Sequence, residues 1–456
     1  MELKKYKLAD IADFNKSSIS KSETFKEIIY LDTSSITENV VSGTVIMNTK
    51  EAPSRAQRTV TNNTIIYSTV RPRLKHYGIL SRPQNNFIVS TGFTTIDIKD
   101  LYKDKIDPRY LYLLLTQPTI TDYIGNIADT AVSAYPSINP SDLSSLCFMF
   151  PDHDIQKTIA DIWNNYDRKI ELNRAINQNL EAMAKQLYDY WFVQFDFPNE
   201  DGKPYKSSGG EMIWNESLKR EIPKGWITTT INGVCTSCRG VSYGKDDLLP
   251  NGNGILVLRG NNIENNHIVY DSNVAFVPYD FINEEQRIKE GDIVMTMSSG
   301  SKAHVGKCAM FYKDSEHTFG AFLSKFTPKK EMRYMIFLFL TSEYFKSLIT
   351  AFCNGTGINN LTNQTFDDVI LVLPNENTLQ QFESKVKPLF DIIGNNEEDI
   401  EILTKQRNEL LPLLMNGQVS INSDLSVCIN LIIRTTTRIC SYPNDLFWSY
   451  LRIVFL

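Results

Sequence analysis

Two long stretches of the chain repeat one order of apolar and polar positions. Residues 110–187 begin with YLYLLLTQPTITDYIGN, and residues 335–410 begin with MIFLFLTSEYFKSLITA. Each then passes through a short apolar segment, FMFP or LVLP, into a heptad pattern. Counterparts lie about 223–225 positions apart: Pro151 and Pro374, Asn173 and Asn396, Leu180 and Leu403, Leu187 and Leu410. This period predicts two duplicated domains, because solenoid repeats are only about 20–45 residues long.

The first heptad pattern runs from about residue 154 to residue 192. Its positions alternate in spacing between three and four, are mostly apolar or aromatic, and include no Gly or Pro: Ile159, Ile162, Tyr166, Lys169, Asn173, Ile176, Leu180, Met183, Leu187 and Tyr190. Such a pattern predicts a coiled-coil helix on the order of 55 Å long. A single domain rarely needs a rod of that length for its own core.

The second heptad pattern closes the second copy: Val386, Leu389, Ile393, Asn396, Ile400, Leu403, Arg407, Leu410 and Leu414. Two similar patterns on one chain predict an antiparallel helix pair, because the intervening domain returns the chain. An Asn buried in such a contact fixes its register at some loss of stability, which is the role expected for Asn173 and Asn396. The alternative is that both are surface residues of imperfect helices.

Short apolar runs between turn residues predict strands at 64–70, 87–98, 147–150, 255–259 and 292–297, and a helix over 108–125 starting at Pro108. Gly, Pro, Ser and charged residues mark 196–222 as a linker. The predicted fold class is therefore α/β (α+β): two globular domains separated by two long antiparallel coiled-coil helices, with a pseudo-two-fold internal repeat. The expected domains are 1–151, 152–195 (central helix), 196–222 (linker), 223–374, 375–421 (distal helix) and a tail, 422–456, of unknown role.

Composition and charge add a constraint on partners. The 456 residues are 42% hydrophobic and 22% charged, with a net charge of −6, as in an ordinary soluble protein that is not a non-specific nucleic-acid coat. Charge is uneven, because residues 50–82 carry seven Lys and Arg against one acid, whereas 391–401 carry five acids and no cation. A locally basic face on an acidic protein suits contact with a polyanion.

Seven cysteines and a beginning, MELKKYKLADIADF, that lacks an apolar run lead us to expect reduced thiols, a cytoplasmic (prokaryotic) location and no membrane span. The lone CxxC of Cys235 and Cys238 lacks the two further ligands that structural zinc requires. The segment from Gly300 to Cys308 departs from a phosphate-binding loop in spacing and in its last residue. No catalytic or metal motif is recognised, which favours a recognition role.

Candidate binding residues are cations and amides in loops that follow predicted strands. TIIYSTVRPRLKHYGIL in the first copy corresponds to DIVMTMSSGSKAHVGKCAMF in the second, so both copies place cations and one His after the same strand. Arg and Lys bind phosphates, and Arg and Asn also read base edges. The candidates are Arg55, Arg58, Arg71, Arg73, Lys75, His76, Arg239, Tyr243, Lys245, Arg259, Asn261, Lys302, His304 and Lys307. The alternative is that these are solvated loops without a ligand.

Over roughly residues 1–421 the chain resembles the specificity subunit of a type I restriction-modification system. The resemblance rests on the repeated order of domain and long helix, on TIIYSTVRPRLKHYGIL with NFIVSTGFTTI, on the FMFP and LVLP junctions, and on the helix ends NLEAMAKQLYDYWF and EILTKQRNELLPLLMNGQV. The tail beyond Ile421 departs from the family. The second domain also keeps fewer cations in the shared loop than the first.

The resemblance implies a sequence-specific DNA recognition subunit, non-catalytic by itself. Each target-recognition domain would read one half of a bipartite site in double-stranded DNA. The helices, with contact residues Ile162, Asn173, Leu180, Leu187, Leu389, Asn396, Leu403 and Leu410, would set the spacer and dock two methyltransferase subunits. S-adenosylmethionine, ATP and Mg would bind those subunits and the motor-nuclease subunits, and neither a cofactor nor a metal would bind this chain. The open alternatives are a coiled-coil adaptor that binds only proteins, a DNA-specificity protein of a related restriction or methylation system, and an unrecognised enzyme.

Overall fold

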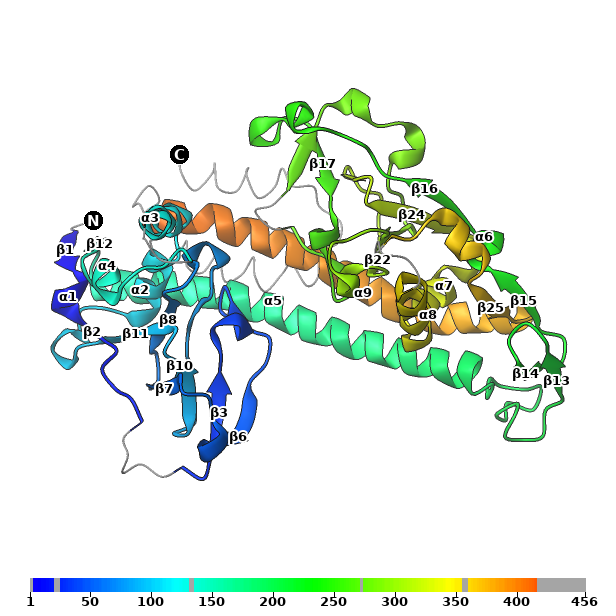
Figure 1. Ribbon diagram of the computed structural model, residues 1–456, viewed down its shortest axis with the longest axis horizontal. Helices are drawn as coiled ribbons and strands as arrows, with labels where there is room; N and C mark the ends of the chain where they lie inside the picture. The colour runs from blue at the N-terminus through cyan, green and yellow to red at the C-terminus, as the bar shows by residue number, and fades with distance from the viewer. Residues whose placement is uncertain (1–2, 20–24, 131–134, 271–273, 355–359, 416–456) are drawn as a thin grey trace. The chain divides into compact units, whose positions relative to one another are not determined.

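The computed structural model describes residues 3–19, 25–130, 135–270, 274–354 and 360–415, and the tail expected at 422–456 lies outside them. The chain divides into two compact units: unit 1 contains residues 1–171 and 401–456, and unit 2 contains residues 172–400. Each unit holds a globular head of strands and short helices together with part of both long helices (Figure 1). The predicted class, two mixed heads with two long helices, is confirmed.

The first head, which we define as residues 4–150, is built on two four-stranded sheets. Its strands are β1 (Lys4–Lys7), β2 (Ala12–Phe14), β3 (Glu27–Leu31), β4 (Ile36–Thr37), β5 (Val40–Val41), β6 (Val45–Asn48), β7 (Ala56–Thr59), β8 (Ile65–Ser68), β9 (Tyr77–Ile79), β10 (Phe87–Ser90), β11 (Phe93–Ile98) and β12 (Cys147–Phe150). The sheet β2-β11-β8-β9 is antiparallel throughout. The sheet β6-β3-β10-β7 contains a parallel pair, β3 with β10. Two small pairs, β1-β12 and β4-β5, complete the head.

The stretch 87–98, predicted as one strand, is two strands in different sheets. The chain leaves β10 and enters β11 through Thr91 and Gly92, which we call the hinge of the first head. A Cβ at Gly92 would lie 2.8 Å from Cγ2 of Thr33, so the hinge accepts no side chain without a shift of its neighbours. The prediction was wrong because a run of strand-forming residues does not show where a chain changes sheet.

The helices of the first head are α1 (Leu8–Ile11), α2 (Pro108–Leu115), α3 (Pro118–Asp129) and α4 (Pro140–Ser144). The single helix predicted over 108–125 is therefore wrong. Asp107 begins α2 by accepting the backbone N–H groups of Arg109 and Tyr110. Pro118 ends it, because a proline disfavours helical geometry in the preceding residue and donates no N–H.

The second head, residues 227–373, repeats this topology, except that among the described residues its second sheet has three strands where that of the first head has four. Its elements are β15 (Ile227–Thr230), α6 (Ile231–Val234), β16 (Cys235–Arg239), β17 (Ile255–Leu258), β18 (Ile263–Glu264), β19 (His267–Ile268), β20 (Ala275–Val277), β21 (Ile293–Thr296), β22 (Cys308–Met310), β23 (Thr318–Phe319), β24 (Leu323–Pro328), α7 (Arg333–Leu340), α8 (Glu343–Asn354) and β25 (Ile370–Leu373). The sheet β16-β24-β21-β22 matches β2-β11-β8-β9, and the parallel pair of β17 with β23 matches that of β3 with β10. The pair β15-β25 matches β1-β12.

The predicted linker, 196–222, contains ordered structure. Residues of this segment form the hairpin of β13 (Met212–Asn215) and β14 (Arg220–Pro223), and they belong to unit 2. Phe197 stacks on both Tyr205 and Trp226, with ring centroids 4.7 Å apart in each pair. The segment that connects the two domains in sequence is therefore folded as part of unit 2.

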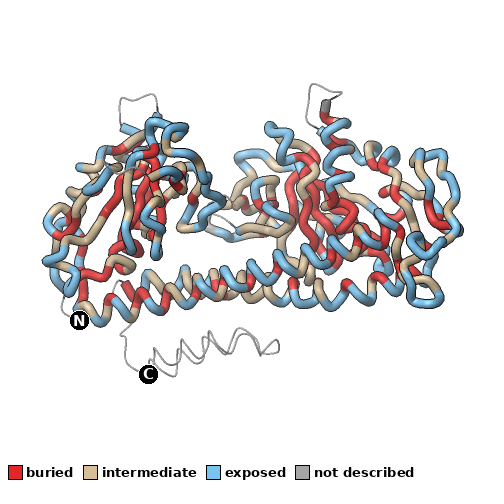
Figure 2. Tube along the Cα trace, turned by 90° about the horizontal axis from the view of Figure 1, so that it is seen from below, coloured by how far each residue is buried: buried red, intermediate tan, exposed pale blue. Residues whose placement is uncertain are grey.

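The two long helices are α5 (His153–Tyr188), which continues into a π-helical turn at Asp189–Val193, and α9 (Glu376–Met415). In unit 2 they run antiparallel: Asn177 contacts Asn396, whereas Trp191, later in the chain, contacts Phe382, earlier in α9. Figures 1 and 2 show the two helices of unit 2 side by side, and the colours of Figure 2 show buried positions recurring along them. In unit 1 the first part of α5 and the end of α9 are joined by an ion pair of Asp167 with Arg407.

Burial along α5 corrects the predicted contact face in its second half. Three predicted contact residues are exposed: Ile176 36%, Met183 55% and Tyr190 36%. The buried residues follow each of them directly: Asn177, Ala184 and Trp191. An α-helix drifts by about 20° per heptad relative to a strict 3.5-residue repeat. Over a long helix the buried residue in each heptad therefore becomes the one directly after the predicted position.

The described residues include no single helix that has both the length and the apolarity to cross a membrane. Lys330–Leu340 and Glu343–Cys353 reach those values only together, as a pair bent by 66°.

Candidate nucleic-acid interface

The first candidate region is the loop of residues 69–76 between β8 and β9, which we call loop 1. Its backbone is held at both ends. Thr69 N–H donates to Gly92 O at 3.0 Å, and Ile138 N–H donates to Thr69 O at 2.9 Å. Ser68 N–H donates to His76 O at 2.8 Å, which closes the loop. Loop 1 therefore presents its side chains from a fixed frame of hydrogen bonds.

Three of the four predicted binding residues of loop 1 are engaged by the first head itself. Arg73 reaches α3, where its guanidinium lies 3.3 Å from Asp122 and 3.1 Å from Asp129 and donates to Asn126. Lys75 forms an ion pair with Glu38. The imidazole Nδ1 of His76 lies 2.6 Å from Ile36 O and 3.2 Å from Thr37 Oγ1. These contacts fix the loop and reduce its local positive charge.

Arg71 is the cation that loop 1 presents most openly. Its side chain lies over the ring of Tyr135, with the guanidinium carbon 4.8 Å from the centroid. Both Arg71 and Lys75 have left-handed backbone angles, with φ of 48° and 56°. Non-glycine residues adopt this region at a steric cost and are held there by surrounding structure, as they are here by the hydrogen bonds of the loop.

The remaining candidates of the first head, Arg55 and Arg58, lie on or beside β7. Arg55 is exposed and lies 3.8 Å from Asp32, a long ion pair that leaves most of its guanidinium in solvent. Arg58 is half-buried and donates to Ser18 Oγ at 3.3 Å. Among the described residues of the first head, Arg55 and Arg71 are therefore the candidates whose charge is least engaged by acidic groups.

The second candidate region is the loop of residues 297–307 between β21 and β22, which we call loop 2. It has the same frame as loop 1, because Met297 N–H donates to Phe322 O at 2.9 Å and Leu361 N–H donates to Met297 O at 2.8 Å. Lys302 and His304 are exposed in a 3₁₀ turn, and Lys307 is half-buried. The sequence match of the two loops is thus also a match of their backbone hydrogen bonds.

The other candidates of the second head gather beside the segment that joins β23 and β24. Arg239 Nε donates to Ala321 O at 3.2 Å, and Val241 N–H donates to Phe319 O at 2.8 Å. Arg259 Nε donates to the hydroxyl of Tyr243 at 2.9 Å. Lys245 and Asn261 are exposed and occupy separate 3₁₀ turns. The structure therefore brings Arg239, Tyr243 and Arg259 to neighbouring segments.

The helix contact contains a polar cluster that the sequence analysis missed. Asn396 donates to Asn177 Oδ1 at 2.7 Å, and Asn177 donates to Glu397 Oε1 at 2.6 Å. Asn396 thus lies in the contact as predicted for its residue type, but its partner is Asn177. Asn173 is buried in the same helix, and its side-chain nitrogen has no partner among the described residues.

His267, on β19 of the second head, joins both helices. Its ring nitrogens lie 3.0 Å from Glu181 on α5 and 3.1 Å from Glu397 on α9. Both pairs are within ion-pair distance, but neither Glu181 Oε1 nor His267 Nδ1 makes a well-aligned hydrogen bond. Burial alone would lower the pKa of His267, but the two carboxylates outweigh burial and raise the pKa to about 10. The imidazole is therefore protonated at neutral pH.

The other predicted contact residues of the helices are buried or partly buried. Ile162, Leu403 and Leu410 are 3%, 0% and 7% exposed. Leu180, Leu187 and Leu389 are partly buried and pack against the core of unit 2. These residues hold helices together and carry no group that binds nucleic acid.

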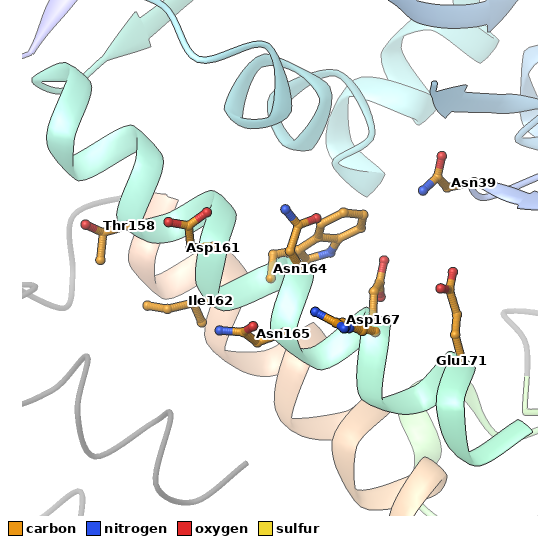
Figure 3. Close-up of a pocket in the computed structure, with 10 residues that line it drawn as sticks. Asn39, Thr158, Asp161, Ile162, Asn164, Asn165, Asp167 and Glu171 are labelled. Atoms are coloured by element: carbon orange, nitrogen blue, oxygen red, sulfur yellow. The ribbon is translucent and has the colours of Figure 1, made fainter. Parts of the chain in front are cut away.

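A hollow of about 730 Å³ in unit 1 lies along the first part of α5 (Figure 3). Nine of its lining residues come from α5, and Asn39 comes from the head. Two of its carboxylates are already engaged, Asp161 by Arg109 and Asp167 by Arg407. The walls are polar, and the described part of the chain holds no group of three or more His, Cys, Asp or Glu placed to hold a metal.

The two cysteines of the CxxC lie on opposite faces of a sheet. Cys235 is in the main core of unit 2, and burial raises its pKa to about 12. Cys238, three residues later on β16, packs against a different cluster. Residues an odd number of positions apart on a strand point to opposite faces, so the pair cannot ligate one ion together.

Comparison with known proteins agrees with this architecture. The family model of the type I restriction modification DNA specificity domain matches residues 1–182 and 223–410, one match for each head with its helix. The type I restriction enzyme HindI specificity subunit of Haemophilus influenzae is 25% identical over 91% of this chain and 99% of its own length. The MjaIX specificity subunit of Methanocaldococcus jannaschii is 27% identical over 75% of this chain and 76% of its own length.

A solved structure shows the same fold. The S subunit of the type I restriction-modification system from M. genitalium is 15% identical, and the match covers 91% of this chain and 96% of that one with a TM-score of 0.50. The family model spans both copies of the repeat and far more than half of the sequence. This chain therefore belongs to the family of type I restriction-modification DNA specificity proteins.

Proposed function

We propose that this chain is the DNA recognition subunit of a type I restriction-modification complex, and that each head reads one half of a split target. The observation that carries the proposal is the duplication. The two heads share the strand order of one four-stranded sheet, a parallel strand pair and the loop frame, yet they carry different side chains in loop 1 and loop 2. Two heads with the same loop backbone and different side chains suit the recognition of two different short DNA sequences.

The long helices suit a spacer between the half-sites. In unit 2 their contact includes an Asn pair, which disfavours sliding because a shift would leave amides buried without partners. The cluster of His267 with Glu181 and Glu397 ties the second head to both helices of unit 2. A fixed head on a helix pair of fixed register supports a constant distance between contacts on DNA.

A second face of α5 supports the docking of a partner protein. In unit 2 the exposed apolar residues Leu172, Ile176 and Met183 follow each other at spacings of four and seven, which places them along one side of the helix. α9 covers another side. We propose that methyltransferase subunits dock on the helices, that S-adenosylmethionine, ATP and Mg bind to those subunits and to motor-nuclease subunits, and that this chain is non-catalytic by itself.

The decisive experiment expresses the chain with its partner methyltransferase and maps methylated positions across a genome by single-molecule sequencing. We expect a split motif with a constant unread spacer. Replacing residues 223–374 by the corresponding domain of another family member should change one half of the motif and leave the other half intact. A change in both halves, or methylation without a split motif, contradicts the proposal.

The spacer role has its own test. One heptad removed from each helix, at positions that face each other, should shorten the unread spacer without changing either half-site, because the side chains stay in register. A heptad removed from α5 alone serves as the control and should destabilise the protein. An unchanged spacer in the paired deletion contradicts the role of the helices as a ruler.

A further inference from the structure

In the second head the chain passes from β23 to β24, which lie in different sheets, through residues 320–322, which we call the hinge of the second head. The two hinges differ in the residue whose carbonyl holds the adjacent loop. In the first head the carbonyl that accepts the N–H of Thr69 belongs to Gly92, and in the second the carbonyl that accepts the N–H of Met297 belongs to Phe322. Thr69 and Met297 are themselves equivalent, because their carbonyls accept the N–H groups of Ile138 and Leu361. Phe322 therefore occupies the place of Gly92.

The side chain of Phe322 does not contribute to the core. It is 69% exposed, whereas its neighbours Phe319 and Leu323 are fully buried. The backbone carbonyl of Phe322 accepts the N–H groups of Met297 and Ser298, at 2.9 and 3.3 Å, so the fold uses the main chain at this position and leaves the ring outside. A single exposed apolar residue is common on protein surfaces and needs no explanation by itself. Its surroundings supply the further argument.

The ring is carried among the candidate recognition residues of the second head. The preceding carbonyl, that of Ala321, accepts from Arg239. Ala321 N–H donates to Val241 O at 2.9 Å, which places the segment leading to Tyr243 alongside the hinge. Loop 2 starts at Met297 and Ser298, the residues bonded to Phe322 O. An exposed aromatic ring is thus held on rigid backbone between two polar loops.

We propose that Phe322 makes an apolar contact with a base of the half-site that the second head reads. The inference rests on the proposed function and adds a specificity-determining residue to it. An aromatic side chain contacts the methyl group of thymine in the major groove, or inserts at a base step, and both contacts distinguish sequences without involving phosphate. Loop 2, with fewer cations than loop 1, is accompanied by this exposed aromatic ring, whereas Gly92 places no side chain at the equivalent point of the first head.

The test uses the complex of the full chain with its methyltransferase, bound to a duplex that carries the mapped site. Phe322→Ala should weaken binding to the intact site by roughly tenfold, in the range of one lost base contact. Binding to a duplex whose second half-site is scrambled should not change. The dependence of affinity on salt should also stay constant, because an apolar contact releases no counterions. Phe322→Leu should keep most of the affinity.

Two controls make the outcome clear. Lys302→Ala combined with Lys307→Ala tests phosphate contacts, and it should reduce the salt dependence that Phe322→Ala leaves intact. Leu101→Ala removes an apolar side chain that is at least as exposed, at 78%, from the first head and should leave affinity unchanged. Equal melting temperatures of Phe322→Ala and the parent show that the fold is intact.

Deoxyuridine in place of each thymine of the second half-site separates the two forms of the contact. If deoxyuridine lowers the affinity as much as Phe322→Ala does, and the two losses do not add, the ring contacts the thymine methyl group. If deoxyuridine leaves the affinity unchanged, the ring inserts at a base step. The inference is overturned if Phe322→Ala binds the intact site as the parent does, or loses equally on the scrambled site. If the parent complex itself does not distinguish intact from scrambled duplex, the proposed function fails.

Discussion

The first and second heads share a frame and use it in different ways. Loop 1 carries more cations, but Arg73, Lys75 and His76 bind acids and carbonyls of the head that carries them. Loop 2 carries fewer cations, and the exposed Phe322 stands at the hinge beside it. A basic segment in a sequence is therefore not yet a nucleic-acid contact, because part of its charge can serve to shape the loop.

The largest loss of stability is expected from a side chain added against the hinge of the second head. A Cβ on Gly240 would lie 2.2 Å from the backbone oxygen of Gly320, and a backbone atom cannot rotate away. We expect Gly240→Ala to destabilise the protein by about 3 kcal/mol, as overpacking against a fixed neighbour does. Gly300→Ala is the matched control, since nothing lies within 4 Å of its Cβ position. Urea denaturation measures both, and equal midpoints would show that the hinge is not rigid.

The next largest effect concerns His267, which ties the second head to its helices. His267→Ala leaves Glu181 and Glu397 partly buried without their cation, and we expect a loss of about 2 kcal/mol at pH 6. The pKa of His267 is about 10 in the folded protein, against 6.5 for an ordinary histidine. The stabilisation should therefore be complete below pH 6.5 and decline as pH rises towards 10.

Thermal unfolding of the parent and of His267→Ala across pH 6 to 10 measures this difference. The gap between the two proteins should narrow as pH rises. A constant gap over that interval would mean that the imidazole contributes by packing and not by its charge.

A smaller effect is expected for Arg73, and it tests whether this residue holds loop 1 in place or binds a DNA phosphate. Arg73 lies against α3 with two carboxylates and one amide, all near the surface, so Arg73→Ala should cost about 1 kcal/mol of stability. Its effect on the salt dependence of DNA binding should be negligible, since this guanidinium is already engaged. Titration of the complex with duplex at several salt concentrations measures this salt dependence. A clear fall in the slope of log affinity against log salt would mean that Arg73 contacts a phosphate.

The smallest effect is expected for Arg71, whose charge is open to solvent beside Tyr135. Arg71→Ala should leave stability within about 0.5 kcal/mol, as surface substitutions usually do. If Arg71 contacts a phosphate, the slope of log affinity against log salt should fall by about 0.9. Arg71→Lys keeps the charge and should keep the slope. The combined neutralisation of Arg71, Arg73 and Lys75 should then reduce the slope no further than Arg71→Ala alone.

The sequence predicted the parts of the molecule that depend on periodicity and repetition. The two long helices follow from their heptads, and the duplicated heads follow from equivalent positions such as Pro151 and Pro374. The equivalence of loop 1 and loop 2 also follows, because both come after the same strand. These features are local or repeated, so they can be predicted from the order of the residues alone.

The parts that were not predicted depend on contacts between distant residues. Nothing near Arg73 in the sequence indicates Asp122 or Asp129, and nothing near Asn396 indicates Asn177. The drift of the contact face along α5 needed the actual helix geometry. One signal was present and unused: the second copy reads GAFLS (320–324) where the first reads STGFT (90–94), which places an aromatic residue where the first has glycine.

The carbonyl of Phe322 has a consequence for how such proteins diversify. Because the main chain performs the structural task at this position, we expect a change of side chain there to leave both sheets intact. Natural selection can therefore sample different side chains at the hinge of the second head at little risk to folding. The first head lacks this freedom, since Thr33 stands against any larger residue at Gly92.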